Sequence, residues 1–494
     1  MSSFAVITVL VGYFIVLLVI SFFTGRKADN QGFFLGNRKS PWYVVAFGMI
    51  GASLSGVTFI SLPGWVESSQ FSYMQMVLGY LVGYLVIATI LMPLYYRLNL
   101  TSIYTYLQDR FGIFSYKTGA SFFLLSRTIG AAFRLFLVAN VLQITIFDAW
   151  KVPFFVTVII TILLIWLYTF KGGIKTIIWT DTLQTFFMLL AVGVSIVLVS
   201  KELNLSFSNI ADTISDSNLS QIFFFDDWTD KRFFWKQFLG GAFITIVMTG
   251  LDQDMMQKNL SCKNVKDAKK NMFWFSITLV PVNLFFLSLG ALLFIFLHQS
   301  GLVYPDDANL IAGQTDNLFP VLATRYLGPV VGIFFILGLV AAAYSSADSA
   351  LTALTTSFTV DIMGTKGKSD KQLSGIRKWV HVLFSIILMI VIMIFQLIND
   401  QNVISAIFVA AGYTYGPLLG LYAFGLFTRL NIRDRLVPLI TILSPVLTYI
   451  INLNSENWLM GYKFGFELLI LNGLITFIGL LIISQKKNKK LEVK

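Results

Sequence analysis

The sequence predicts an all-α integral membrane protein with about thirteen transmembrane helices, and three observations predict it. Of the 494 residues, 56% are hydrophobic and only 12% are charged, with a mean hydropathy of +0.76. A single soluble core does not normally grow to this size with this composition. Apolar stretches long enough to cross the hydrocarbon core recur along the chain, and basic residues gather in alternate intervals between them.

The predicted spans share a run of mainly apolar residues of membrane-crossing length. In chain order they cover residues 4–24, 41–63, 72–98, 116–147, 152–169, 176–200, 235–257, 272–298, 329–361, 376–397, 402–427, 434–452 and 464–484. The first lacks a basic start and a small-residue cleavage site, which favours a retained helix over a signal peptide. No soluble domain interrupts the series, so residues 1–494 are predicted to form one transmembrane domain.

The net charge of +11 is interpreted as a topology signal. Intervals on one side of the predicted spans hold 27 of the 36 Lys and Arg residues, and intervals on the other side hold 6. Positive loops stay in the cytoplasm. The alternation therefore places the N-terminus outside and the C-terminus in the cytoplasm of an inner (cell) membrane, and excludes a nucleic-acid-binding patch.

Residues for enzyme chemistry are scarce. The single cysteine, Cys262, excludes an internal disulfide, and the two histidines, His298 and His381, form no cluster for zinc or haem. No nucleophile–base motif appears. The sequence therefore predicts neither an enzyme nor an organic cofactor, and no obligate protein partner is evident beyond the lipid bilayer.

Two predicted spans are interrupted. A Gly/Ser cluster between Gly51 and Gly56 falls at the centre of span 41–63, and Gly416-Pro417 interrupts span 402–427. Unwound backbone at membrane depth persists only where it lines a buried or watery cavity, and such breaks mark the binding sites of secondary transporters. Glycines that only allow close helix packing remain an alternative for the first cluster.

The densest polar sequence within a span is 341–349, which reads AAAYSSADS. Ala342, Ser345, Ser346 and Ser349 follow i, i+3, i+4, i+7 spacing and share one helix face, with Asp348 beside it. A single serine in a membrane helix usually bonds to nearby backbone. Polar groups at this depth otherwise serve ions, substrates or proton relays, so this segment predicts a functional site.

These oxygens suit a monovalent cation. Hard cations prefer several oxygen ligands, which carbonyls freed at 51–56 and the hydroxyls of Ser345 and Ser346 would supply. Asp181 is a second acid within a span, about 9 Å from its cytoplasmic end, where a snorkelling carboxylate is an alternative. Asp252 and Asp254 are predicted to be gate or loop contacts near the cytoplasmic edge.

Three segments together resemble the sodium/solute symporter family, which has a leucine-transporter-like architecture. They are GGIKTIIWTDTLQ at 172–184, the serine segment 345–349, and MPLYYRLNLTSIYTYLQDRF at 92–111. The resemblance covers nearly the whole chain. It implies thirteen helices with a 5+5 inverted repeat and broken helices, the repeats covering about 41–200 and 235–427. Spans 4–24, 434–452 and 464–484 would be peripheral.

The resemblance also implies ion sites. The main sodium site would use carbonyls of Gly51, Leu54 and Ala342 and hydroxyls of Ser345 and Ser346. A second cation site, present in some members, would use Asp181, Ser345, Asp348 and Ser349. Asp348 departs from the two-sodium sialic acid transporters, which have a serine there, so the second ion is either sodium or a proton carried by Asp348.

For the solute, the resemblance points to the broken span and its neighbours. Ser53, Ser55 and Thr58 are the positional candidates on that span, followed by Tyr73 and Gln75.

The arginine with which sialic acid transporters hold the substrate carboxylate aligns with Ala131. Arg134 lies on roughly the same face, near the helix centre. It is predicted either to bind an anionic solute, as a guanidinium suits a carboxylate, or to pair with a structural carboxylate or backbone carbonyls.

The function implied is secondary active import of a small organic solute by alternating access, driven by one or two Na⁺ ions. Sugars, sialic acids, inositols, amino acids and monocarboxylates all fall within the family. A proton-coupled transporter of the same fold is the alternative. An ion channel is a more distant one, because the polar residues cluster at mid-depth and do not form a continuous pore.

Overall fold

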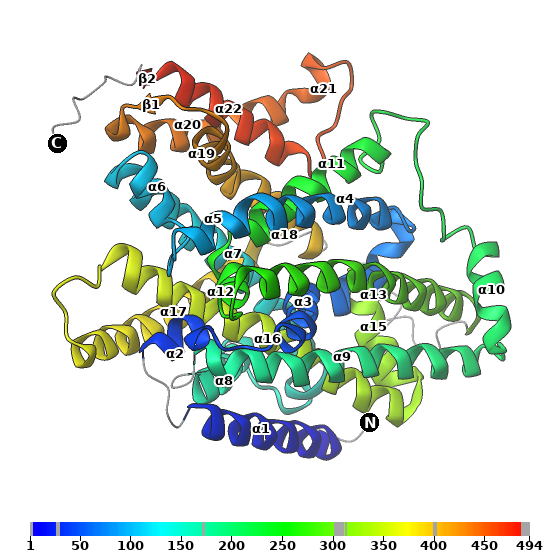
Figure 1. The fold of residues 1–494 in the computed structure, drawn as a ribbon. Helices are drawn as coiled ribbons and strands as arrows, with labels where there is room; N and C mark the ends of the chain where they lie inside the picture. The colour runs from blue at the N-terminus through cyan, green and yellow to red at the C-terminus, as the bar shows by residue number, and fades with distance from the viewer. Residues whose placement is uncertain are drawn as a thin grey trace.

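The computed structural model describes residues 3–25, 30–169, 173–300, 311, 314–398 and 403–485, and nearly all of them are helical. Helices α3 (Trp42–Ser69) and α16 (Gly328–Ser357) lie in the middle of the molecule (Figure 1). Helix α1 (Ser3–Gly25) lies along one edge, and α20 (Val437–Leu453) and α22 (Leu468–Ile482) lie along the opposite edge.

The other spans complete the bundle. They are α4 (Tyr73–Val86) continuing into α5 (Met92–Arg97), α7 (Ile113–Leu142), α8 (Phe154–Thr169), α9 (Ile174–Glu202), α11 (Phe234–Thr245) with α12 (Gln253–Leu260), α13 (Val265–Ser300), α17 (Asp370–Ile398), and α18 (Val403–Thr414) with α19 (Gly416–Phe427). The short elements are α2 (Asn30–Leu35), α6 (Thr105–Arg110), α10 (Ile210–Asp216), α15 (Leu318–Val321), α21 (Ser455–Trp458), and the antiparallel strands β1 (Asn431–Ile432) and β2 (Ser484–Gln485).

The predicted membrane class is confirmed, but the count of thirteen is not. Within the described residues, nine helices are long and apolar enough to cross a membrane alone, and two bent pairs bring the number to eleven. The two remaining predicted segments correspond to α8 and α22, of 16 and 15 residues. At about 1.5 Å per residue these helices are shorter than the hydrocarbon core of about 30 Å.

Burial separates a core from a periphery. In the most apolar 18-residue stretch of α3, 89% is buried inside the protein, and in that of α16, 78%. The corresponding share is only 22% in α1 and in α20. Helices α3, α9 and α16 all pack against one another. Small residues permit this close approach. A Cβ added at Gly338 of α16, for example, would collide with Phe59 of α3 and with Ala191 of α9.

Both interruptions predicted from the sequence are present, and a third was missed. Ser55 has φ 45° and ψ 174°, so the helical path of α3 is broken there. Helices α18 and α19 meet at an angle of 46° just before Gly416. Helices α11 and α12 meet at 64° across Leu251 and Asp252. The predicted span 235–257 therefore corresponds to a bent pair of helices. The second helix, α12, extends beyond this span and contains Lys258.

The N-terminus of α7 is capped from a distant part of the chain. The Asp434 carboxylate accepts the backbone N–H groups of Phe114 and Ser115, each at 2.8 Å, and the Ser115 hydroxyl at 2.5 Å. The first N–H groups of a helix have no partner within the helix, and a carboxylate there also opposes the positive end of the helix dipole. Asp434 therefore ties α7 to the start of α20.

We expect Asp434→Ala to lower the free energy of unfolding by about 1–2 kcal/mol, as loss of a helix cap does. Thermal unfolding of the purified protein in detergent measures the effect. Asp434→Asn, which keeps one acceptor oxygen, should lose less. Asp226→Ala, in an exposed loop, is the control that should leave the melting temperature unchanged. An equal melting temperature for Asp434→Ala and the unmodified protein would contradict the capping role.

Candidate functional site

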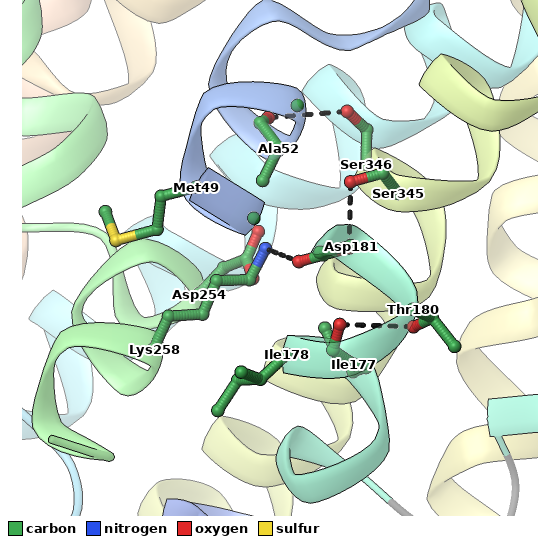
Figure 2. A network of polar contacts seen from close by, with 12 residues as sticks. Met49, Ala52, Ile177, Ile178, Thr180, Asp181, Asp254, Lys258, Ser345 and Ser346 are labelled. Atoms are coloured by element: carbon green, nitrogen blue, oxygen red, sulfur yellow. Dashed lines mark hydrogen bonds and ion pairs between the residues drawn. The ribbon is translucent and has the colours of Figure 1, made fainter. Parts of the chain in front are cut away.

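The break in α3 faces the serine segment of α16. A helix that is interrupted at Ser55 leaves the carbonyls of the preceding turn without their usual backbone donors. One of these, the Ala52 carbonyl, lies 3.5 Å from the Ser346 hydroxyl (Figure 2). Backbone carbonyls and a hydroxyl from a facing helix are therefore gathered at one buried point between α3 and α16.

The glycines before the break also serve packing. The Gly51 N–H donates to the Thr185 hydroxyl of α9 at 3.0 Å, and a Cβ at Gly51 would collide with that residue. The close-packing interpretation is therefore correct for Gly51, and the broken-helix interpretation is correct for Ser55. The two are compatible because they concern successive turns of one helix.

The predicted main sodium ligands lie on these two helices and are all buried. Gly51 and Leu54 belong to the turn before the break, and Ala342, Ser345 and Ser346 to the facing part of α16. The Ser345 hydroxyl donates to Asp181 Oδ1 at 2.8 Å. Donation uses the hydroxyl hydrogen and leaves the oxygen lone pairs available to a cation. The assignment of these five residues to sodium stays a prediction.

The predicted second cation site contains a residue that the sequence interpretation placed elsewhere. The Lys258 ammonium of α12 lies 2.7 Å from Asp181 Oδ2, and both side chains are about 1% exposed. Asp181 therefore contacts Lys258 with one oxygen and Ser345 with the other (Figure 2). The snorkelling alternative for Asp181 is wrong, because its carboxylate faces the protein interior. Asp348 and Ser349 of α16 are fully buried nearby.

The predicted span 235–257 ends before Lys258 and so leaves this residue in the cytoplasmic interval that follows, which is wrong. The predicted span ended at 257, whereas the helix continues to Leu260 after its 64° bend. The bend turns α12 into the protein, which buries Lys258 beside Asp181. The signal in the sequence was the break at Gly250-Leu251-Asp252, which resembles the interruptions recognised in two other spans.

A cavity lies beside the α3 break, between α3, α4, α7, α11, α13 and α18. Five of the six predicted solute contacts line it: Ser53, Ser55, Thr58, Tyr73 and Arg134. The sequence interpretation missed five other uncharged polar side chains of the lining, Tyr80, Tyr84, Thr245, Thr249 and Asn283. Tyr73, Tyr80 and Tyr84 recur at helical spacing on α4, a stripe of hydroxyls that could have indicated the cavity.

Gln75, the sixth predicted solute contact, lies outside the cavity lining. Its amide donates to the Arg232 carbonyl at 2.8 Å, and its carbonyl oxygen accepts the Phe224 N–H at 3.1 Å. Gln75 is fully buried. Its side chain fastens the segment before α11 to the start of α4, so the geometry gives it a structural role.

The two arginines of α7 that line the cavity differ in their partners. Arg127 forms a buried ion pair with Asp254 and lies 4.0 Å from Asp252. Asp252 also accepts the Tyr415 hydroxyl at 2.5 Å and caps α12 through two backbone N–H groups. Arg134, by contrast, makes no hydrogen bond or ion pair with any residue that the structure describes.

Asp252 and Asp254, which were predicted to be gate or loop contacts near the cytoplasmic edge, are both fully buried in the protein. Their contacts join α7, α12 and the junction of α18 and α19. They therefore connect three of the elements that surround the cavity, which fits the predicted gate role better than that of a loop contact.

A helical bundle with broken spans at a buried polar cavity is the architecture of a secondary transporter. A sequence profile of the Sodium:solute symporter family matches residues 33–440. The chain belongs to this family. It is a sodium-coupled solute symporter and not an enzyme, with Na⁺ as coupling ion and a solute as transported partner.

Relatives in this family are similar along most of their length. The sodium/sialic acid symporter of Aliivibrio fischeri is 25% identical over 443 residues, covering 87% of this chain and 85% of the relative. The sodium/sialic acid symporter of Proteus mirabilis is 24% identical over 453 residues, covering 89% of this chain and 88% of the relative. The human sodium-coupled monocarboxylate transporter 2 is 25% identical over 424 residues, covering 84% and 66%.

Solved structures share the fold. A Na⁺-coupled sialic acid symporter in a substrate-bound outward-open state superposes with a TM-score of 0.81 at 20% identity, covering 98% of this chain and 99% of the other. The nucleobase-cation-symport-1 family transporter Mhp1 gives a TM-score of 0.57 at 13% identity, covering 92% and 94%. The leucine-transporter-like fold is thereby confirmed, while the repeat boundaries 41–200 and 235–427 stay a prediction.

We expect Ser346→Ala to raise the Na⁺ concentration for half-maximal stabilisation of the purified protein by roughly tenfold or more. Removing a hydrogen-bonding oxygen from a charged group costs about 1.5–3 kcal/mol, and 1.4 kcal/mol is tenfold. Thermal unfolding across a NaCl series, with choline chloride at constant ionic strength, measures this. Thr352→Ala, which removes another buried hydroxyl from α16, is the matched control. Equal sodium dependence in both variants would refute the role of Ser346.

Proposed function

We propose that this symporter carries a small organic anion, whose carboxylate binds Arg134, together with Na⁺ bound between the α3 break and α16. The protein would be a multi-pass protein of the inner (cell) membrane and would import its solute. The observation that carries the proposal is Arg134 itself, a cavity-lining arginine without a hydrogen-bond or ion-pair partner among the described residues.

The contrast with Arg127 strengthens this argument. An arginine at membrane depth is costly unless it is compensated, and Arg127 is compensated by Asp254. Arg134 lies two turns further along α7 and has no such carboxylate. A carboxylate is the natural complement of a guanidinium, which can bind both of its oxygens. An anionic solute in the cavity would therefore supply the charge that the protein omits.

The remaining cavity lining suits the polar parts of such a solute. Ser53, Thr58, Tyr73 and Asn283 present hydroxyls and an amide around the space that Arg134 borders. The phenol groups of Tyr73 and Tyr80 are hydrogen-bonded to each other at 2.9 Å. These groups offer both donors and acceptors but no carboxylate, so the cavity lining carries a positive charge that favours an anion.

The same turn of α3 connects the proposed solute and sodium sites. Ser53, Leu54 and Ser55 line the cavity, and the Leu54 carbonyl is one of the proposed sodium ligands. An ion that orders this turn would also fix the solute contacts on it. Each ligand would therefore raise the affinity for the other by the same factor, which thermodynamic linkage requires.

The named solutes of several relatives agree with an anion. Sialic acid and monocarboxylates carry carboxylates, and the human sodium/iodide cotransporter, 24% identical over 417 residues, is named for a simple anion. Within the family range expected from the sequence, the proposal favours sialic acids and monocarboxylates over neutral sugars and inositols.

We expect Arg134→Ala to weaken binding of the carboxylate solute by roughly 30-fold or more, because truncating one partner of a buried charge pair costs about 2–5 kcal/mol. A thermal-shift screen in NaCl identifies the solute, with each acid compared with its neutral ester or amide. The acid should stabilise the protein only with Na⁺, and the neutral counterpart should not. Arg134→Lys, which keeps the charge without the bidentate geometry, should be intermediate. Equal stabilisation by acid and ester would refute the anion but not the sodium coupling.

The proposed orientation has an independent test. With the N-terminus outside, residue 208 lies outside and residue 366 lies in the cytoplasm, and both side chains are exposed. The native Cys262 is buried and should stay unlabelled. We expect a membrane-impermeant maleimide to label Ser208→Cys but not Lys366→Cys in intact cells, and both after lysis. The reverse pattern would refute the orientation.

A further inference from the structure

A surface of α13, here called the basic patch, combines three lysines with two aromatic side chains. Lys266, Lys269 and Lys270 are exposed in the first two turns of the helix, and Phe273 and Trp274 of the next turn are 56% and 53% exposed. Their spacing of i, i+3, i+4, i+7 and i+8 places all five on one helix face. The five side chains line one hollow at the surface of the protein.

The basic patch faces away from the protein. On the opposite face of the same turns, Ala268, Met272 and Phe275 are fully buried. Further along the exposed face, Ile277 and Leu284 are 44% and 40% exposed. A helix face that passes from lysines through aromatic rings to aliphatic side chains is typical of a membrane span that crosses the lipid headgroup region. This order places the three ammonium groups among the headgroups.

Within the described residues, none of the three lysines forms an ion pair. The Lys270 ammonium lies 5.8 Å from the centre of the Trp42 ring of α3, and the other two lysines make no hydrogen bond. Asp267 is the only acidic residue between positions 255 and 300. Its carboxylate accepts the side-chain amide of Asn264 at 3.2 Å. Three lysines against this one carboxylate leave the basic patch with a net positive charge.

The start of α3 borders the basic patch with residues of the same kinds. The Ser40 N–H donates to the Ser261 carbonyl at 3.1 Å, which holds the chain before α3 against the chain before α13. Lys39 is exposed there, and Tyr43, beside Trp42, is 61% exposed. Basic residues followed by aromatic rings therefore occur at the starts of two neighbouring helices, which pack against each other.

We propose that the basic patch binds an anionic phospholipid, with the lipid phosphate at the three ammonium groups and an acyl chain along α13 beyond Trp274. Each ammonium group carries three hydrogen-bond donors and no acceptor, so it complements a phosphate. Clusters of lysines beside a membrane span attract anionic lipids. The exposed rings of Phe273 and Trp274 would contact the glycerol and the start of the acyl chain, contacts that a soluble anion does not use.

Lysines that only fix the orientation of the chain would look the same, so the test compares headgroups. Native mass spectrometry of the purified full-length protein in detergent counts the lipids that each chain retains. The protein is titrated with phosphatidylglycerol or with phosphatidylcholine of the same acyl chains. We expect one phosphatidylglycerol to be retained at concentrations at which phosphatidylcholine is not. Lysines with only an orienting role predict no such preference.

We expect the variant Lys266→Gln/Lys269→Gln/Lys270→Gln to bind phosphatidylglycerol roughly 100-fold more weakly. Each lysine near an anionic lipid surface contributes about 1 kcal/mol, and 1.4 kcal/mol is tenfold. All three positions are exposed, so the substitutions remove charge without disturbing the buried core.

The matched control is Lys151→Gln/Lys201→Gln/Lys231→Gln, which removes the same charge from exposed positions outside the basic patch and should retain the lipid. Equal retention of the two lipids by the unmodified protein would overturn the proposal, and so would equal weakening in the two triple variants. Displacement of the lipid by an equal concentration of glycerol 3-phosphate would also overturn it, because the site would then be one for a soluble phosphate. These measurements require neither Na⁺ nor a solute, so their outcome is independent of the proposed function.

Discussion

Charge neutrality in the membrane interior is the constraint on which the arrangement of this protein depends. Helix α12 carries Asp254 and Lys258 one turn apart, and the two side chains reach to different neighbours. Asp254 pairs with Arg127 of α7, and Lys258 pairs with Asp181 of α9. Leaving one partner of a buried pair alone costs about 3–5 kcal/mol. The two pairs therefore fix α12 between α7 and α9, and that placement requires the 64° bend of its span.

The same constraint explains why the sequence predicted the helices better than the site. A run of apolar residues is a local property, so every predicted segment coincides with an apolar helix or a bent pair. The break at Ser55 was also local, because glycines and serines cluster around it. Charge pairing is not local. Asp181 and Lys258 are 77 positions apart, and no local sequence pattern around either residue predicts that the two form an ion pair.

The incorrect assignments have a common physical origin. Lys258 was placed in a loop because a straight helix through 235–257 would end before it. The bend redirects α12 so that this side chain is buried. Gln75 was predicted from its position to contact the solute. Its side-chain amide instead hydrogen-bonds to the backbone carbonyl of Arg232 and the backbone N–H of Phe224. In each case the direction of a side chain depended on the path of a distant backbone segment.

The proposed ion and solute sites follow from how the protein distributes its compensated and uncompensated charges. Arg127 and Lys258 have carboxylate partners in fixed helices, so these cations hold helices together. Arg134 borders the cavity without one among the described residues. The free carbonyls before Ser55 and the hydroxyls of α16 form a neutral set of oxygens next to the Asp181–Lys258 ion pair. A mobile anion and a mobile cation would then complete the two proposed sites, which share one turn of α3. In this proposal, each bound ligand would order the turn of α3 that the other ligand also contacts. Binding of one would therefore favour binding of the other, without any direct contact between the two ligands.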